Sequence, residues 1–376
     1  MENIYLKTKD KKTCNGCTAC ALVCPKGAIK MVGDNEGFIY PHIIQDKCVE
    51  CGKCLKTCSN YAKKQDSKYI ACAAINKDEK ILLNSTSGGA FSALTNKLFN
   101  YEDSVCYGVA YNENLEVVHM RATSKNEAEK FRGSKYLRSN ILGIYEQVKK
   151  DLKEGKRVLF TGTPCQCAGL NTYLNKDYPN LILIDIICHS NPSPKVFKRY
   201  IKGLELKRST KVKNYSFRAK SNGWNNLKPI VEYENGIIEE ETTFLTAFLR
   251  AIINRPCCYD CKFIKPYNFA DITLGDFWGV EKLTNISDYQ NGTSLVLLNT
   301  KKGQDFFEGI QGLALYKLDE DIDVFKYNHK KPDNPHRNRE KFFNKLDNIK
   351  DKDILEYINK MSKERLARRI INKLRG

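Results

Sequence analysis

Two cysteine-rich stretches decide the fold of the first part of this chain: CNGCTACALVCP at residues 14–25 and CVECGKCLKTCS at residues 48–59. Each stretch places four cysteines in the spacing C-x2-C-x2-C-x3-C, so eight of the sixteen cysteines lie close together. Dense thiols in a reducing compartment indicate metal binding or catalysis. A zinc site needs two C-x2-C pairs and no further cysteine. Each stretch here has a third cysteine at the same short spacing, which favours a metal centre other than zinc.

The repeated spacing is that of ferredoxins with two [4Fe–4S] clusters, in which three neighbouring cysteines hold one cluster and the fourth reaches the other. We therefore expect one cluster on Cys14, Cys17, Cys20 and Cys58. The other cluster is expected on Cys48, Cys51, Cys54 and Cys24. Residues 28–31 and 38–40 are expected to pair as small strands, with Gly33 and Gly37 framing their turn. Residues 1–62 are thus predicted to form an α+β ferredoxin-like domain.

Composition and charge exclude several classes of protein. With 41% hydrophobic and 28% charged residues, the chain is not a wholly disordered one. No apolar run has the length of a membrane span, and the opening MENIYLKTKDKK has no apolar signal core, so we expect a cytoplasmic protein. The formal charge of +18 would attract acidic partners, but no standard nucleic-acid-binding motif is present. We therefore expect a solvated basic surface and no nucleic-acid partner.

Beyond a polar linker at residues 61–68, strand and helix patterns alternate along the chain. Strands are predicted at residues 69–75, 104–111, 115–121, 157–161 and 181–187. Helices are predicted at residues 88–99 and 141–154, with a crossover helix near 166–173. This alternation predicts an α/β domain over residues 69–330, with a largely parallel or mixed sheet.

The C-terminal residues 331–376 are predicted to form a basic helical extension. Apolar side chains recur along residues 354–374 at a spacing that gives a helix one apolar stripe. We expect this stripe to pack on the rest of the protein. The alternative is peripheral contact with an anionic membrane.

A second group of cysteines is expected at the carboxyl edge of the predicted sheet. Cys165 and Cys188 each follow a buried strand, and parallel neighbours end side by side at the edge where open α/β sheets bind ligands. Together with Cys258 and Cys261 they make four ligands, for a third [4Fe–4S] cluster or for zinc.

Four further cysteines are open to other readings. Cys167 and Cys257 each neighbour a proposed ligand and can replace it. Cys72 and Cys106 lie in the middle of predicted strands, where a cysteine behaves as an ordinary small core residue.

The segment NSTSGGA at residues 84–90 precedes a predicted helix. Small residues, hydroxyls and free backbone N–H groups at a helix start can cradle a phosphate, although ordinary helix capping uses the same residues. The basic turn GSKY at residues 133–136 would add a cation and an aromatic face for a dinucleotide.

Seven motifs occur in one order: the paired cysteine runs, STSGG, GSKY, TGTPCQ, CH-x-x-PSP, C-x2-C and ADI-x-x-GD-x-WG. In this order they resemble the family of coenzyme F420 hydrogenase/dehydrogenase beta subunits, over roughly residues 10–285. The resemblance implies an FAD site that uses Ser85, Thr86, Ser87, Gly88, Gly89, Gly133, Ser134, Lys135, Tyr136 and Thr163.

The same resemblance places a cluster beside the flavin, on Cys165, Cys188, Cys258 and Cys261. His189 and Asp276 are the candidate catalytic residues. His189 suits proton transfer, because the ordinary pKa of an imidazole lies close to neutral pH. The alternative is that His189 only makes a hydrogen bond at a crowded turn. For Asp276, the alternative is holding the turn between a strand and a helix.

The expected function is that of an iron–sulfur flavoprotein oxidoreductase. Clusters carry single electrons, and FAD collects two of them for exchange with a deazaflavin-like or other small-molecule donor or acceptor. A redox partner protein or reduced ferredoxin would supply or receive the electrons. One alternative is a non-catalytic subunit that relays electrons to a separate enzyme, as in surface-polysaccharide biosynthesis. Another is a regulatory iron–sulfur protein with a vestigial flavin fold.

Overall fold

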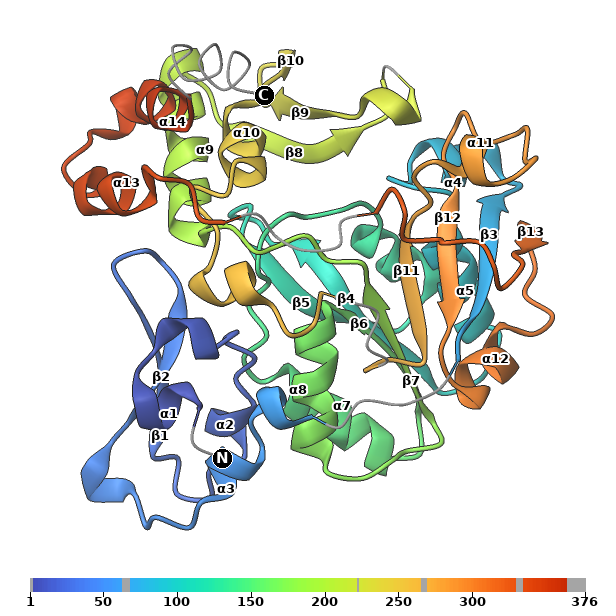
Figure 1. The fold of residues 1–376 in the computed structure, drawn as a ribbon, viewed down its shortest axis with the longest axis horizontal. Helices are drawn as coiled ribbons and strands as arrows, with labels where there is room; N and C mark the ends of the chain where they lie inside the picture. Colours follow the sequence, from blue (N-terminus) through green and yellow to red (C-terminus); the bar gives the residue numbers. More distant parts are fainter. Residues whose placement is uncertain (1–2, 63–67, 222, 265–268, 329–333, 364–376) are drawn as a thin grey trace.

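A computed structural model describes residues 3–62, 68–221, 223–264, 269–328 and 334–363. Figure 1 shows a small N-terminal region, a large central sheet covered by helices, and a third region beside the carboxyl end of that sheet. Within the described ranges, no helix has the length and apolar character that a membrane crossing requires.

The N-terminal region is a β-hairpin surrounded by short helical turns. Its strands pair antiparallel with Ile29 opposite Ile43, which confirms the two predicted strands. The Asp34 side chain accepts hydrogen bonds from the amides of Glu36 and Phe38, and Gly37 takes a φ of +89° that closes the turn. The elements are α1 (Tyr5–Thr8), α2 (Ala19–Leu22), β1 (Ile29–Gly33), β2 (Ile39–Ile43), α3 (Lys53–Lys56), and 3₁₀ turns at Lys11–Thr13, Gln45–Lys47 and Ser59–Tyr61.

Among the described residues, eight strands form the central sheet, in the order β13-β3-β12-β11-β7-β6-β4-β5. Strands β4, β6, β7 and β11 are parallel neighbours, whereas the hairpin β4–β5 and the pairs among β11, β12, β3 and β13 are antiparallel. The α/β class is therefore correct and the sheet is mixed, since antiparallel strands extend both flanks of a parallel centre. The strands are β3 (Ile70–Asn76), β4 (Ser104–Tyr111), β5 (Val117–Ala122), β6 (Arg157–Gly162), β7 (Leu181–Ile186), β11 (Ile272–Asp276), β12 (Ser294–Leu298) and β13 (Leu313–Lys317).

Helices cover both faces of this sheet and leave its parallel centre buried. Buried side chains of α5 and α12 share one core with the sheet, and those of α7 and α8 share another. Cys72 and Cys106 belong to the first core, as expected for mid-strand cysteines. The helices are α4 (Glu79–Leu83), α5 (Ala90–Leu98), α6 (Lys125–Ala128), α7 (Ile144–Lys153), α8 (Pro164–Leu174), α11 (Val280–Leu283) and α12 (Lys301–Phe307), with a 3₁₀ turn at Glu129–Phe131.

The crossover helix α8 begins earlier than the apolar pattern predicts. Pro164 occupies its first turn, where a missing N–H costs nothing, and the Thr163 amide donates to Oε1 of Gln166 over 3.0 Å. Cys165 therefore lies in the first turn of a helix and not in a preceding loop. Helix α7 ends as predicted, with Gly155 at a φ of +84° just beyond it.

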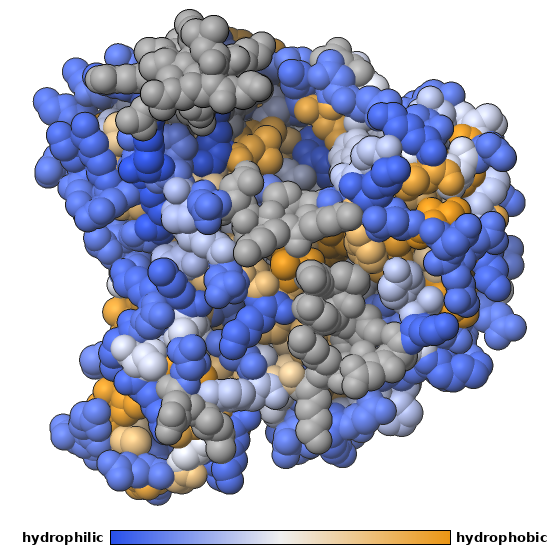
Figure 2. Space-filling view, in the orientation of Figure 1, coloured by the Kyte–Doolittle hydropathy of each residue, from blue (hydrophilic) through white to orange (hydrophobic). Residues whose placement is uncertain are grey.

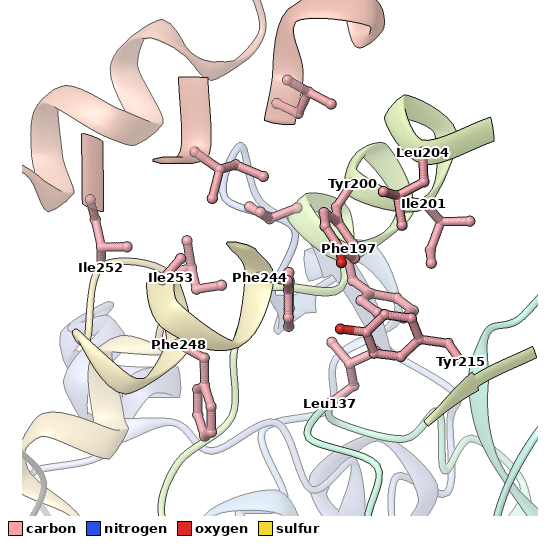
Figure 3. Packing of buried hydrophobic residues seen from close by; sticks show 14 of the residues in the cluster. Leu137, Phe197, Tyr200, Ile201, Leu204, Tyr215, Phe244, Phe248, Ile252 and Ile253 are labelled. Carbon is pink, nitrogen blue, oxygen red and sulfur yellow. The ribbon is translucent and has the colours of Figure 1, made fainter. Parts of the chain in front are cut away.

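The third region was not predicted as a sheet. It contains the antiparallel strands β8 (Val212–Ala219), β9 (Lys228–Tyr233) and β10 (Ile238–Glu240), with helices α9 (Pro194–Arg208), α10 (Thr243–Leu249), α13 (Arg339–Leu346) and α14 (Ile354–Ser362). Further 3₁₀ turns lie at Trp224–Asn226, Pro256–Asp260 and Asp351–Asp353. Figure 3 shows the aromatic core, in which Phe197, Tyr215 and Phe244 meet within ring-contact distance.

The C-terminal helix packs into that same core. Ile354 and Ile358 of α14 are buried there beside Phe342 of α13. This agrees with packing of the predicted apolar stripe on the protein as far as Ser362, the last residue of α14. Residues 364–376, which carry the rest of the predicted stripe, lie outside the described residues.

The turn of the N-terminal hairpin is bound by the third region. The Ser193 hydroxyl, at the start of α9, donates to the Glu36 carbonyl, and Lys195 Nζ donates to the Asn35 carbonyl over 2.9 Å. Arg339 of α13 donates through NH1 to the Glu36 carboxylate, also over 2.9 Å. The tip of the hairpin is thus attached to elements more than 150 residues away in the sequence.

Candidate metal centres and cofactor pocket

The first predicted set of cysteines converges on one small cavity. This cavity has a volume of about 30 Å³, and its lining includes Cys14, Cys17, Cys20 and Cys58, and also Cys54 of the second predicted set. Gly16, at a φ of +72°, lets the loop fold back on itself, and α2 carries Cys20. Burial raises the pKa of the Cys58 thiol to about 12, and the neighbouring thiol of Cys17 adds to this shift. A neutral thiol is favoured here until a cation is bound.

The second predicted set lies further out. Cys48 and Cys51 lie on the loop that enters α3, Cys54 lies in the first turn of α3, and Cys24 follows α2. Burial raises the pKa of Cys54, and the thiols of Cys24 and Cys51 act on it as close neighbours. Cys51 is exposed, so this set lies at the surface of the protein.

The third set of cysteines surrounds a cavity of about 160 Å³ between the N-terminal region and the central sheet. Because β6 and β7 run parallel, α8 and the segment after β7 start at one edge, and the 3₁₀ turn Pro256–Asp260 closes over them. The cysteines that line this cavity are Cys165, Cys188, Cys257, Cys258 and Cys261. Cys167 is not among them, since its thiol faces the carbonyl of Ile184 at 3.5 Å. Within the described ranges, no three His, Cys, Asp or Glu side chains are spaced to hold a single metal ion.

Two buried arginines face these thiols. Arg138 donates through NH1 to Sγ of Cys165 over 3.4 Å, while its Nε and NH2 have no hydrogen-bond partner. Arg255 donates through Nε to the carbonyl of Cys14, and its NH2 lies 3.9 Å from the Cys14 sulfur. None of the ion pairs found among the described residues involves either arginine, whereas other part-buried arginines pair with carboxylates. A buried cation requires a counter-charge, and thiolates on an anionic cluster would supply it.

A candidate cofactor site of about 430 Å³ lies at the carboxyl edge of the central sheet, and its size is typical of cofactor pockets. Figure 2 shows apolar surface exposed in the hollow between the third region and the sheet. Nearly all predicted flavin contacts line the cavity: Ser85, Thr86, Ser87, Gly89, Gly133, Ser134, Lys135, Tyr136 and Thr163. Gly88 is not among its lining residues, because it packs where a Cβ atom would lie 2.2 Å from the carbonyl oxygen of Ala74.

The two predicted flavin loops are tied to each other and to the sheet. Thr86 Oγ1 accepts a hydrogen bond from the amide of Ser134 over 2.9 Å. The Ser87 hydroxyl donates to the carbonyl of Thr293, also over 2.9 Å. Lys135 donates through Nζ to the carbonyls of Lys130 and Arg132, and burial lowers the pKa of Lys135 to about 7. Lys135 therefore fixes the shape of its own loop.

Both candidate catalytic residues line the cofactor cavity. His189 and Thr163 line it together with the cysteine cavity, so these two residues form the boundary between the two sites. The His189 ring packs edge-on against Phe248, with 5.1 Å between ring centroids. Asp276 ends β11, and its Oδ2 accepts from NH1 of Arg218 over 2.7 Å. Its Oδ1 and Arg218 NH2 have no hydrogen-bond partner, so this buried pair retains polar capacity for a ligand.

Sequence reasoning missed three residues of these sites: Arg138, Arg218 and Arg255. A single arginine outside a motif carries no spacing signal, so its role depends on which residues the fold brings beside it. Arg138 lies close to GSKY, and Arg255 directly precedes the stretch PCCYDC that holds Cys258 and Cys261, so each lies beside a motif without being part of its spacing.

Comparison with known proteins confirms the resemblance found in the sequence. Residues 155–321 match the family that comprises the C terminus of the coenzyme F420 hydrogenase/dehydrogenase beta subunit, and residues 13–62 match the "4Fe-4S dicluster domain". The second match supports iron–sulfur clusters in the N-terminal region.

Individual proteins are similar to this chain as well. The F subunit of F(420)H(2) dehydrogenase from Methanosarcina mazei is 24% identical over 190 residues, which make up 46% of this chain and 53% of the relative. The chain thus spans about half the length of this curated relative. A chain from a structure of the F420-reducing [NiFe] hydrogenase complex of Methanosarcina barkeri aligns with 83% of this chain and 94% of its own length, with 16% identity and a TM-score of 0.47.

Proposed function

We propose, for a chain whose residues 155–321 belong to the family of coenzyme F420 hydrogenase/dehydrogenase beta subunits, that it is an iron–sulfur flavoprotein oxidoreductase. In this proposal the N-terminal cysteines hold two [4Fe–4S] clusters, and Cys165, Cys188, Cys258 and Cys261 hold a third. The 430 Å³ cavity holds FAD.

One observation carries the proposal: the candidate sites follow one another in space. Cys51 of the outer set is exposed, and Cys14 of the inner set contacts Arg255, which lines the third cysteine cavity. Thr163 and His189 line both that cavity and the flavin cavity. A series of this kind suits single-electron steps from the surface to a buried two-electron centre.

Particular residues have distinct tasks in this proposal. The loops around Thr86 and Ser134 bind the flavin, which when present supplies a centre that takes one or two electrons. Asp276 and Arg218 present hydrogen-bonding groups in the same cavity. His189 lies where an imidazole can hold or release a proton between the cavity and the third cysteine set.

We further propose that a partner protein exchanges electrons at the exposed cysteine set, and that a small flat molecule exchanges them at the flavin. A deazaflavin is one candidate for that molecule, on the strength of the relative named as part of an F420H2 dehydrogenase. The apolar side chains of Ile186 and Leu249 line the cavity and are exposed, which suits a flat ring system.

Anaerobic purification followed by iron, sulfide and flavin counting tests the proposal. We expect about twelve irons per chain, four for each cubane, and FAD identified by mass. Fewer than about eight irons after reconstitution would refute even the two N-terminal clusters. Full iron without flavin would instead favour an iron–sulfur protein that has lost its flavin.

A relay role is the second candidate function, favoured by the name of the relative, which is one subunit among those of a larger enzyme. In that case the protein passes electrons to a separate catalytic chain. A turnover assay with a reduced electron carrier and a deazaflavin acceptor distinguishes the two, because a relay shows no steady turnover until its partner chain is added.

A further inference from the structure

We propose that Arg255 raises the reduction potential of the inner N-terminal cluster by holding a buried positive charge against the sulfur of Cys14. This inference rests on the proposed function, since it requires a cluster on that cysteine set. It assigns a tuning and positioning role to a residue that belongs to neither cysteine motif.

The first step of the argument is the contact itself. Arg255 Nε donates to the Cys14 carbonyl over 2.9 Å, and NH2 donates to the Ile39 carbonyl over 2.8 Å. The same NH2 lies 3.9 Å from Sγ of Cys14. Two carbonyls of the N-terminal region thus fix the guanidinium beside a predicted cluster ligand.

The residues around the Arg255 guanidinium exclude water from it. Arg255 is 1% exposed, and its guanidinium carbon lies 4.4 Å from the ring centroid of Tyr40 and 5.3 Å from that of Phe38. Gly16 allows the close approach, because a Cβ atom there would come within 3.1 Å of the guanidinium nitrogens. In such an environment a charge acts on its neighbours far more strongly than it does in water.

The other end of Arg255 belongs to the third cysteine set. Its amide donates to the carbonyl of Asn191, and its carbonyl accepts from the amide of Cys258 over 3.0 Å. Cys258 lies three residues further along the chain and is a predicted ligand of the third centre. One residue therefore connects the inner cluster site, through its side chain, with the third site, through its backbone.

The electrostatic consequence follows from charge balance. Reducing a cluster adds one electron and one negative charge, with no bond formed and no proton taken up, and a fixed cation nearby favours the reduced form. Arg255 thereby favours transfer of one electron from the outer cluster into the inner cluster. In the proposed function, the outer cluster receives this electron from the reduced partner protein. The electron then leaves the inner cluster for the third centre, next to which the backbone of Arg255 lies.

Redox titration of the loaded protein, followed by electron paramagnetic resonance, tests this inference. Arg255→Gln removes the charge, and we expect a lower potential for the inner cluster and an unchanged potential for the outer one. Cys51→Ala, which removes a ligand of the outer cluster, identifies the signal that belongs to that cluster. Arg255→Lys keeps the charge and should retain most of the wild-type potential.

Arg138→Gln is the matched control, because it removes a second buried arginine that contacts Cys165 and not Cys14. Because the charge of Arg138 also acts on the Cys14 thiol, but less strongly than that of Arg255, we expect a smaller fall in the potential of the inner cluster than Arg255→Gln produces. If Arg255→Gln fails to hold its iron, the comparison of Arg255→Lys with wild type decides: a large fall in potential with the charge retained overturns the electrostatic role. An inner-cluster potential equal to wild type in iron-loaded Arg255→Gln overturns it as well. Iron-free wild-type protein would instead refute the proposed function.

Discussion

The first cysteine loop and helix α8 meet at Cys17 and Gly169, where a Cβ atom added to Gly169 would lie only 2.8 Å from the Cβ atom of Cys17. The hydroxyl of Tyr145 would be equally close to it. The N-terminal region therefore packs against the same helix that carries Cys165 in its first turn. Glycine is required at this helical position because of a neighbour distant in the sequence.

Replacing Gly169 by alanine tests this contact. In an ordinary helix such a change gains about 0.5–1 kcal/mol. Here we expect a loss of about 1–3 kcal/mol, since Cys17 and Tyr145 must shift to make room. Thermal unfolding and iron content of Gly169→Ala measure the effect. The control is Gly33→Ala in β1, where no atom lies within 4 Å of the added methyl group. Equal melting temperatures and iron contents for the two variants would contradict the prediction.

Two cysteines of α8 should behave differently although they are two residues apart. Cys165→Ala removes a side chain that lines the third cysteine cavity, and we expect a loss of about four irons, one cubane. Cys167→Ala changes a thiol that faces the carbonyl of Ile184, and should keep every iron. Iron and sulfide counts after anaerobic reconstitution decide. If Cys167→Ala loses iron and Cys165→Ala keeps it, Cys167 is the cluster ligand and Cys165 is not.

The buried pair of Arg218 and Asp276 predicts a coupled loss of stability and flavin. Asp276→Asn leaves the buried guanidinium without its counter-charge, so we expect destabilisation of about 2–4 kcal/mol and reduced flavin content. Asp305→Asn provides the control, because its pair with Lys301 is on the surface and should contribute little. Flavin absorbance and thermal unfolding give the two readouts. Unchanged flavin content and stability in Asp276→Asn would rule out this role.

A buried carboxyl group in β7 predicts a pH dependence of stability. Burial raises the pKa of Asp185 to about 7, and the nearby carboxylate of Asp271 adds to that shift. The folded protein therefore keeps this proton up to about pH 7, whereas the unfolded chain releases it near its ordinary value of about 4. The folded state binds more protons within this window, so the contribution of Asp185 to stability falls as the pH rises from about 4 to about 7.

Asp185→Asn removes the titrating proton but keeps an oxygen that can accept from Thr273 Oγ1. The stability of this variant relative to wild type should increase by on the order of 2 kcal/mol between pH 5 and pH 7.5, and then level off. Melting temperatures of both proteins at several pH values measure the difference. A constant difference across this range would show that Asp185 does not titrate there.

The parts of the fold that repeat or alternate were predictable from the sequence. Residues 28–31 and 38–40, with glycines framing the turn between them, predicted the hairpin β1–β2. The apolar runs at residues 157–161 and 181–187 predicted parallel neighbours that bring Cys165 and Cys188 to one edge. Strand β12 is buried throughout, and its antiparallel pairing with β3 joins residues over 200 positions apart, which no local pattern reports. The sheet β8–β10 was not predicted, although buried residues alternate with partly exposed ones along β9, which is the pattern of a half-buried strand.

The residues of the candidate sites were also only partly predictable from the sequence. Motif residues such as Thr86 and Cys258 were found because their neighbours in the sequence carry the signal. Arg138 and Arg255 were not found, because the role of each depends on its contact with a cysteine thiol of a different element. The sequence likewise could not exclude Cys167 as a ligand of the third centre. That exclusion requires knowing that its thiol faces the carbonyl of Ile184 in the sheet.

The attachment of the hairpin tip at Asn35 and Glu36 has a consequence for the proposed exchange of electrons. Ser193, Lys195 and Arg339 hold the hairpin tip, and Cys17, in a different loop of the N-terminal region, abuts α8. A domain anchored at two separated points cannot swing on a tether between donor and acceptor, as shuttling carrier domains do. In the proposed function, the N-terminal region would therefore stay in place while its redox partner approaches and leaves.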